Sequence, residues 1–162
     1  TFKVSAVRSM GRSAAGVRGA RLRDGDYLIG AAPLNEDDQV LVISEKGYGK
    51  KTPASEYPIK GRGGLGIKTV NVTEKNGPLA GLTTVQGDED LMVVTDKGVI
   101  IRFGVESVSQ TRRSAIGVHL IKMDADSVVA TMTKVEKETA ETDPTEASAE
   151  EAETPVEGPN EI

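Results

Sequence analysis

The stretch Lys60-Gly-Arg-Gly-Gly-Leu-Gly66, followed by Ile67-Lys68, combines closely spaced glycines with basic side chains. Such a stretch cannot fill a core, whereas glycine allows tight turns and a close approach of the backbone to a ligand. We therefore expect an exposed loop that leads into a strand. The motif occurs three times, at offsets of 50 and 51 residues, which indicates a repeat protein with a recurring basic loop. The three copies are Arg12-Ser-Ala-Ala-Gly16-Val17-Arg18, Arg62-Gly-Gly-Leu-Gly66-Ile67-Lys68 and Arg113-Ser-Ala-Ile-Gly117-Val118-His119.

Each repeat also has the pattern of a β-hairpin. Residues 39–44 have apolar residues on both faces of the expected strand, which is typical of a strand covered on both sides, and residues 91–95 mirror residues 40–44 at an offset of 51. The turns Glu45-Lys46-Gly47 and Asp96-Lys97-Gly98 place glycine where a tight hairpin needs it. Strands are predicted to return after both turns, and further strands are expected at residues 17–22, 27–32, 118–123 and 127–135.

About four short strands in a unit of fifty residues, with no amphipathic helical stretch, predict an all-β fold. The expected architecture is a β-propeller-like or β-pinwheel array of about three four-stranded blades. The repeats are placed at about residues 1–52, 53–103 and 104–135. Because the chain opens on Thr1, inside a repeat, we expect it to be the C-terminal piece of a longer protein.

The end of the chain differs in composition from the rest. Residues 136–162 hold ten acidic residues and one basic residue, so that residues 1–135 hold 15 acidic and 19 basic ones. The end has too few apolar residues to offset the entropy of ordering, and we predict a disordered acidic tail at 136–162. A mildly basic body with an acidic tail is typical of proteins that act on nucleic acid.

Composition excludes several classes of protein. Without cysteine there is neither a disulfide nor a thiolate site. Apolar runs are too short for a membrane span, and the first residues lack the apolar segment of a signal peptide, so we expect a cytoplasmic protein without a membrane partner. A single histidine, His119, leaves little material for catalysis. We expect no catalytic residue, metal site or cofactor site.

Two other kinds of site are weaker interpretations. The acidic pairs at 37–38 and 88–90 could hold a cation, but solvated turns between strands are the more common role of such residues. Residues 61–66 have the glycines of a nucleotide-binding loop, but the Lys-Ser/Thr ending and the following helix are missing. The other two copies of the loop lack its glycine density, which also argues against a nucleotide site.

Basic side chains recur at matching positions of the three loops, although Asn71 interrupts one position and His119 stands where Arg18 and Lys68 stand earlier. Equivalent positions of a repeat array line up along one edge. A curved row of cations there suits the phosphates of a bent duplex and gives little sequence specificity. For any single arginine, a solubility charge is an equally good explanation, but the recurrence favours function. The predicted DNA-binding residues are Arg12, Arg18, Arg21, Lys60, Arg62, Lys68, Arg112, Arg113 and Lys122.

Three stretches resemble a known family: Met10-Gly-Arg-Ser-Ala-Ala-Gly-Val-Arg-Gly-Ala-Arg-Leu22, residues 60–68 with Val72-Thr-Glu-Lys-Asn-Gly77, and Val93-Val-Thr-Asp-Lys-Gly98. They are similar to the last blades of the C-terminal domain of bacterial DNA gyrase A subunits, over residues 1–135, and the tail is similar to the variable tail of those subunits. The resemblance implies a six-bladed β-pinwheel whose blades exchange strands. It also implies a basic rim that wraps double-stranded DNA and so directs negative supercoiling.

The resemblance further implies partners and cofactors outside this chain. The gyrase B subunit would join the complete gyrase A protein in a heterotetramer of two A and two B subunits, associated with the nucleoid. ATP and Mg²⁺ would be used elsewhere in that holoenzyme, and the tyrosine that cleaves DNA belongs to the N-terminal part of gyrase A. This fragment alone is therefore expected not to be an enzyme.

The match to the family pattern is incomplete. The family's diagnostic box, Gln-Arg-Arg-Gly-Gly-Lys-Gly, belongs to the first blade, and the nearest copy here has Leu65 at the position of the lysine. The C-terminal domain of the corresponding topoisomerase IV protein is an alternative, since its blades are built alike. A propeller used as a protein-interaction scaffold is another, which high salt would distinguish from DNA binding. The tail is also hypothesised to compete with DNA for the basic rim.

Overall fold

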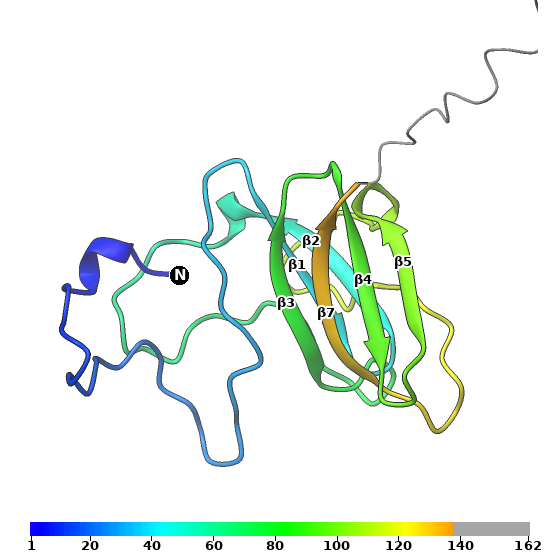
Figure 1. Cartoon of the computed structure of the whole chain (residues 1–162), viewed down its shortest axis with the longest axis horizontal. Coiled ribbons are helices and arrows are strands. Elements are labelled where there is room, and N and C mark those ends of the chain that lie inside the picture. Colours follow the sequence, from blue (N-terminus) through cyan, green and yellow to red (C-terminus); the bar gives the residue numbers. More distant parts are fainter. Residues whose placement is uncertain (138–162) are drawn as a thin grey trace, which may run out of the picture.

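Two antiparallel sheets form the body of the computed structural model, which describes residues 1–137 (Figure 1). The first sheet has the strand order β3-β1-β2-β6 and the second has the order β5-β4-β7. The strands of the first sheet are β1 (Gln39–Ser44), β2 (Tyr48–Pro53), β3 (Leu79–Val85) and β6 (Val118–His119). Those of the second are β4 (Glu89–Thr95), β5 (Ile100–Gly104) and β7 (Val129–Glu136). No α-helix occurs in the described part of the chain, and the predicted all-β class is confirmed.

Both predicted hairpins are present. β1 pairs with β2 and β4 pairs with β5, in antiparallel registers that include Val42 opposite Lys50 and Val93 opposite Ile101. Gly47 closes the first hairpin with a φ of 75°, in the left-handed region that glycine enters without strain. Its turn is also crowded, because a Cβ atom on Gly47 would lie 2.6 Å from the carbonyl oxygen of Ile121.

Each hairpin takes its outer strand from the repeat that follows it. β3 lies after the second basic loop, yet it pairs with β1 of the preceding hairpin, for instance through Leu41 opposite Thr83. β7 pairs with β4 in the same way, and both pairings have a register shift at the last residues of the central strand. On the other edge, β6 pairs with β2. The first sheet therefore joins three successive repeats.

Short 3-10 helices confirm the period of the repeat. They occur at η1 (Val4–Ala6), η2 (Ala54–Glu56) and η3 (Val105–Ser107), which are 50 and 51 residues apart. Each ends in the same way, with the backbone N–H of the residue after the helix donating to the carbonyl of its first residue. The three repeats thus share local geometry even where they differ in the strands around them.

The strands predicted at residues 17–22 and 27–32 are wrong. In repeat order, residues 28–34 and 67–68 are the equivalents of β3 and β6, and the described part of the chain offers them no hairpin to pair with. A strand is defined by such a ladder, so these segments run as loops, and Leu28 is 70 % exposed. They border a hollow of about 1510 Å³. Figure 1 shows these segments without arrows beside the two sheets.

The core lies between the sheets, and its buried members are aliphatic. One cluster is centred on Leu41 of β1 and Leu91 of β4, and the other on Ile43 and Val93 two residues later. Leu120, Phe103 and Met132 pack against both clusters. The two clusters are therefore consecutive layers of a single core. Almost every residue of β1 is buried in this core.

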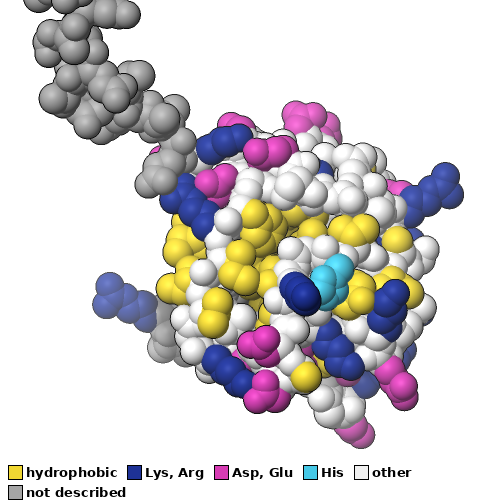
Figure 2. Space-filling model, turned by 90° about the vertical axis from the view of Figure 1, so that its right-hand side faces the viewer, with side chains coloured by type: hydrophobic (Ala, Val, Ile, Leu, Met, Phe, Trp, Pro, Cys, Tyr) yellow, Lys and Arg dark blue, Asp and Glu magenta, His cyan; other side chains and the backbone are white. Residues whose placement is uncertain are grey.

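The outer edge of β5 carries no strand in the described part of the chain, whereas the equivalent edge of β2 carries β6. Val99 and Ile100 are 53 % and 59 % exposed there. Figure 2 views the molecule from the β5 side and shows hydrophobic side chains gathered next to the histidine. The described residues include no helix that is long and apolar enough to cross a membrane. β7 ends at Glu136, and the rest of the predicted tail, from residue 138, lies outside the described residues.

Leu41 and Leu28 provide a matched test of this core, because Leu41 is fully buried and Leu28 is mostly exposed. Leu41→Ala leaves a cavity between the sheets and should lower the free energy of unfolding by about 2–5 kcal/mol. Leu28→Ala removes the same atoms from a side chain that already faces solvent, and it should change the free energy of unfolding by less than about 0.5 kcal/mol. Urea unfolding followed by circular dichroism measures both, and equal losses would contradict the position of the core.

Candidate nucleic-acid interface

The first two basic loops lie side by side along the backbone. The N–H of Gly63 donates to the carbonyl of Gly19 at 2.8 Å, and the N–H of Arg21 donates to that of Gly64 at 2.9 Å. The N–H of Lys60 also donates to the carbonyl of Thr1 at 3.0 Å, the repeat equivalent of the bond from Thr111 to Lys51. These bonds fix the first loop against the second, so the spacing of their side chains is set by the backbone.

The recurring arginines of the second and third loops reach back to the loop before them. Nη1 of Arg62 donates to the carbonyl of Arg18 at 3.0 Å, and Nη1 of Arg113 donates to that of Lys68 at 2.7 Å. Arg18 and Lys68 occupy the same repeat position, so the two contacts are equivalent. Arg12, the first of the recurring arginines, is exposed and makes no such bond within the described part of the chain.

The third loop has an additional anchor that sequence reasoning missed. Lys50 of β2 is fully buried, and its Nζ donates to the carbonyls of Arg112 and Arg113 at 2.7 and 2.6 Å. Oε2 of Glu56 accepts from the N–H of Arg113 at 3.1 Å. The pair Lys50-Lys51 was the available signal: in a strand, one of two consecutive lysines must face inward.

The pKa of the Lys50 ammonium lies well below its ordinary value. Burial lowers its pKa from 10.5 to about 8; the charge of Glu56 raises it, and that of Arg113 lowers it further. Gly117 allows the third loop to lie this close to β2. It has a φ of 94°, and a Cβ atom there would lie 2.6 Å from the carbonyl oxygen of Gly49.

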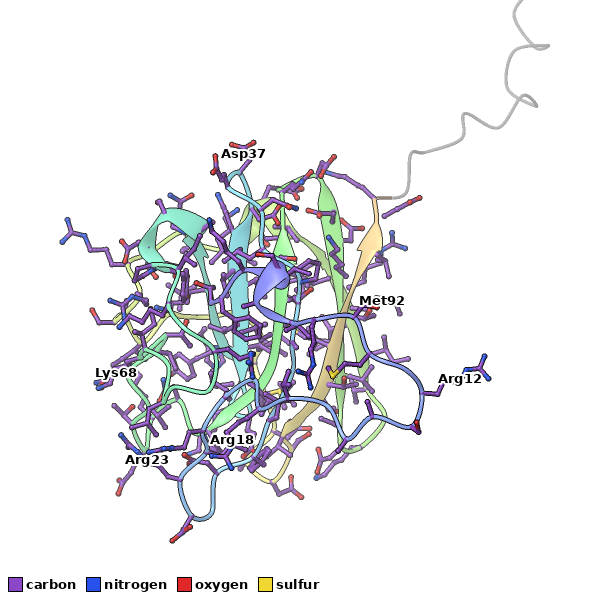
Figure 3. All side chains as sticks on the ribbon, turned by 90° about the vertical axis from the view of Figure 1, so that its left-hand side faces the viewer. Arg12, Arg18, Arg23, Asp37, Lys68 and Met92 are labelled. Carbon is purple, nitrogen blue, oxygen red and sulfur yellow. The ribbon has the colours of Figure 1, made fainter. Side chains whose placement is uncertain are left out.

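The structure brings only some of the predicted basic residues together. In Figure 3, Arg18, Arg23 and Lys68 lie in the same half of the view, Asp37 lies at the opposite end, and Arg12 projects away from the body on its own. Arg23 was not predicted, because the other two repeats have no basic residue at its position. All of the predicted residues except Arg113 are exposed; the exposed ones are Arg12, Arg18, Arg21, Lys60, Arg62, Lys68, Arg112 and Lys122.

His119 differs from its repeat equivalents Arg18 and Lys68. Its ring contacts that of Tyr48 edge to face, with the centroids 4.8 Å apart and the planes at 77°. Lys75 approaches the same tyrosine, with Nζ 5.7 Å from the ring centroid. The third repeat therefore uses this position for an aromatic contact with β2.

The acidic turns organise the backbone at the other end of the molecule. Oδ2 of Asp38 accepts from the N–H of Asn35 at 2.8 Å, which is the main reason that the pKa of its carboxyl is lowered. Glu89, the repeat equivalent, accepts from the N–H groups of Gln86 and Gly87, both at 2.9 Å. No group of three or more His, Asp or Glu residues that could hold a metal ion occurs among the described residues.

The repeat found in the geometry is also found by comparison with known proteins. The family model described as the DNA gyrase C-terminal domain, beta-propeller, matches residues 1–35, 38–86 and 89–136. The chain belongs to this family. The DNA gyrase A protein of Staphylococcus epidermidis is 51 % identical over 139 residues, which are 85 % of this chain and 16 % of that protein. The gyrase A protein of Staphylococcus aureus is 51 % identical over 142 residues, 86 % of this chain and 16 % of that protein. The chain thus spans about a sixth of the gyrase A proteins it matches.

Solved structures agree with this assignment. A structure of the DNA gyrase A C-terminal domain superposes with a TM-score of 0.75 at 25 % identity, over 82 % of this chain and 45 % of that one. The C-terminal domain of DNA topoisomerase IV superposes equally well, with a TM-score of 0.77 at 25 % identity, over 83 % of this chain and 42 % of that one. The two enzymes share the fold, and it is the sequence identity to gyrase A proteins that favours gyrase.

The lowered pKa of Lys50 leads to a prediction about pH. Because the folded state releases the Lys50 proton near pH 8 and the unfolded state near pH 10.5, the unfolded state holds more protons between these values. The free energy of unfolding of the natural chain should therefore rise, relative to that of Lys50→Met, from pH 8 to pH 10.5. Urea unfolding of both proteins at several pH values measures the difference. Parallel pH profiles would contradict a buried, perturbed lysine.

Proposed function

We propose that this chain binds duplex DNA along the edge formed by its basic loops, as part of a gyrase A protein that wraps DNA. The observation that carries the proposal is the hydrogen-bonded alignment of the first two loops. Arg18, Arg23 and Lys68 lie in the same half of the view in Figure 3. The acidic turn that contains Asp37 lies at the opposite end of that view. Exposed cations that lie close together attract the phosphate backbone.

The chemistry of this edge suits phosphate rather than bases. Exposed arginine and lysine side chains on loops neutralise phosphates and release counterions, which gives affinity without sequence information. Because successive loops are held at fixed spacing, a duplex that contacts all of them must follow their row and bend. Bending of this kind would give a gyrase the handedness it needs for negative supercoiling. DNA cleavage, ATP and Mg²⁺ are assigned to other parts of the holoenzyme.

The partners proposed are the remainder of the gyrase A protein and the gyrase B protein. The hollow between residues 30–36 and 54–67 supports the first of these, since it has the position and the apolar lining for a hairpin of an adjacent repeat. Such a hairpin would find strand partners in residues 28–34 and 67–68, the equivalents of β3 and β6. Family membership supports the further proposal of a complex of two A and two B subunits at the nucleoid.

Salt dependence is the property that identifies phosphate binding. Affinity of the 1–162 chain for a fluorescent duplex, measured by anisotropy, should fall steeply between about 50 and 200 mM salt. The triple change Arg18→Gln, Arg23→Gln, Lys68→Gln should weaken binding and reduce the slope of log K against log[salt] by about 0.9 for each lost phosphate contact.

Lys134→Gln is the matched control, because Nζ of Lys134 is paired with Glu89 at 3.1 Å, beside the acidic turn. It should leave both the affinity and the slope close to those of the natural chain. Thermal unfolding of each variant verifies that it is folded. A chain that fails to bind DNA at low salt would overturn the proposal, and binding of a protein partner that persists at high salt would favour a scaffold instead.

A further inference from the structure

The guanidinium of Arg62 bridges two carbonyls of the preceding repeat. Nε donates to Ala6 at 3.3 Å, and Nη1 donates to Arg18 at 3.0 Å. Ala6 ends the 3-10 helix η1, and Arg18 follows the first basic loop, so one side chain joins both ends of that loop to the next. The planar, fixed fork of an arginine is suited to holding two acceptors at once.

Arg113 repeats the Nη1 contact of this arrangement one loop later. Its Nη1 donates to the carbonyl of Lys68, which is the repeat equivalent of Arg18, and its side chain is half-buried. Its backbone is held as well, by Lys50 and Glu56. A phosphate contact would need a guanidinium turned towards solvent, whereas this one is turned towards the neighbouring loop.

We propose that Arg62 and Arg113 are positioning residues that set the distance between successive basic loops, and that DNA is contacted by the basic side chains these links align. This inference rests on the proposed DNA-binding function. It changes the role of two residues that their recurrence in the sequence predicts to be DNA contacts. The recurrence then has a structural cause at positions 62 and 113, where the arginine joins its loop to the one before it.

Arg12 provides a comparison within the same chain. It occupies the equivalent position, is exposed, and has no carbonyl partner among residues 1–137. If the recurring arginines acted as phosphate contacts, exchange for lysine would keep the charge and have a similar, small effect at all three positions. If they act as links, the exchange should matter at positions 62 and 113, where the fork has partners, and much less at position 12.

The first experiment compares Arg62→Lys/Arg113→Lys with Arg12→Lys in the 1–162 chain. The double variant should bind duplex DNA about tenfold more weakly than Arg12→Lys, the loss expected for charge-assisted hydrogen bonds, with a smaller salt slope despite its unchanged net charge. Equal affinities and slopes of the double variant and Arg12→Lys would overturn the proposal.

A second readout needs no DNA. The chain has no cysteine, so spin labels can be attached through Ser13→Cys and Ser114→Cys, in the first and third loops, and the distance between them measured by double electron–electron resonance. The distribution should be narrow in the natural background and broad in the double variant, and it should stay narrow with Arg12→Lys.

The two readouts separate the possible failures. A distribution that stays narrow in the double variant would show that the arginines are not links and would overturn the inference. A broad distribution with undiminished DNA affinity would also overturn it, because loop spacing would then not matter for binding. If the natural chain binds no DNA, the proposed function fails by itself, and the inference falls with it even if the distance measurement finds the loops linked.

Discussion

The ladder between β1 and β3, repeated between β4 and β7, is the interaction on which the rest of the structure depends. It joins each hairpin to the strand that follows the next basic loop, so that no repeat completes its sheet alone. The core between the sheets is consequently shared: Leu41 of β1 packs in one cluster with Val85 of β3 and Leu91 of β4. A core substitution in one repeat therefore also affects the packing of the next repeat.

Strand exchange also explains why the basic loops form a row. The second loop connects the β1–β2 hairpin to β3 and the third connects the β4–β5 hairpin to β7, so both ends of each of these loops are confined to one sheet. Within this frame, backbone bonds such as that from Gly63 to Gly19 and the arginine links from Arg62 and Arg113 fix the remaining freedom. The cations that we propose to contact DNA are therefore positioned by residues that do not contact DNA themselves in this account.

Features that depend on local sequence could be predicted, and those that depend on distant partners could not. The hairpin turns at Gly47 and Gly98 and the buried strand β1 follow from glycine positions and an apolar run. The strand expected at residues 27–32 fails, because the described part of the chain offers it no hairpin to pair with. The burial of Lys50 and the inward turn of Arg113 depend on contacts that are 62 and 45 residues away in the chain. Charge recurrence indicated the loops, but it could not show that Arg62 and Arg113 donate to carbonyls of the loop before them.

Amide chemical shifts recorded while a short duplex is added to the ¹⁵N-labelled chain at low salt would test most directly that DNA follows the row of basic loops. Signals from residues 12–23, 60–68 and 112–122 should move together as duplex is added, and should return as salt is raised. Signals from the acidic turns, residues 35–38 and 86–90, should stay in place. Shifts confined to those turns or to the open edge of β5, or no shifts at all, would contradict DNA binding by the loops.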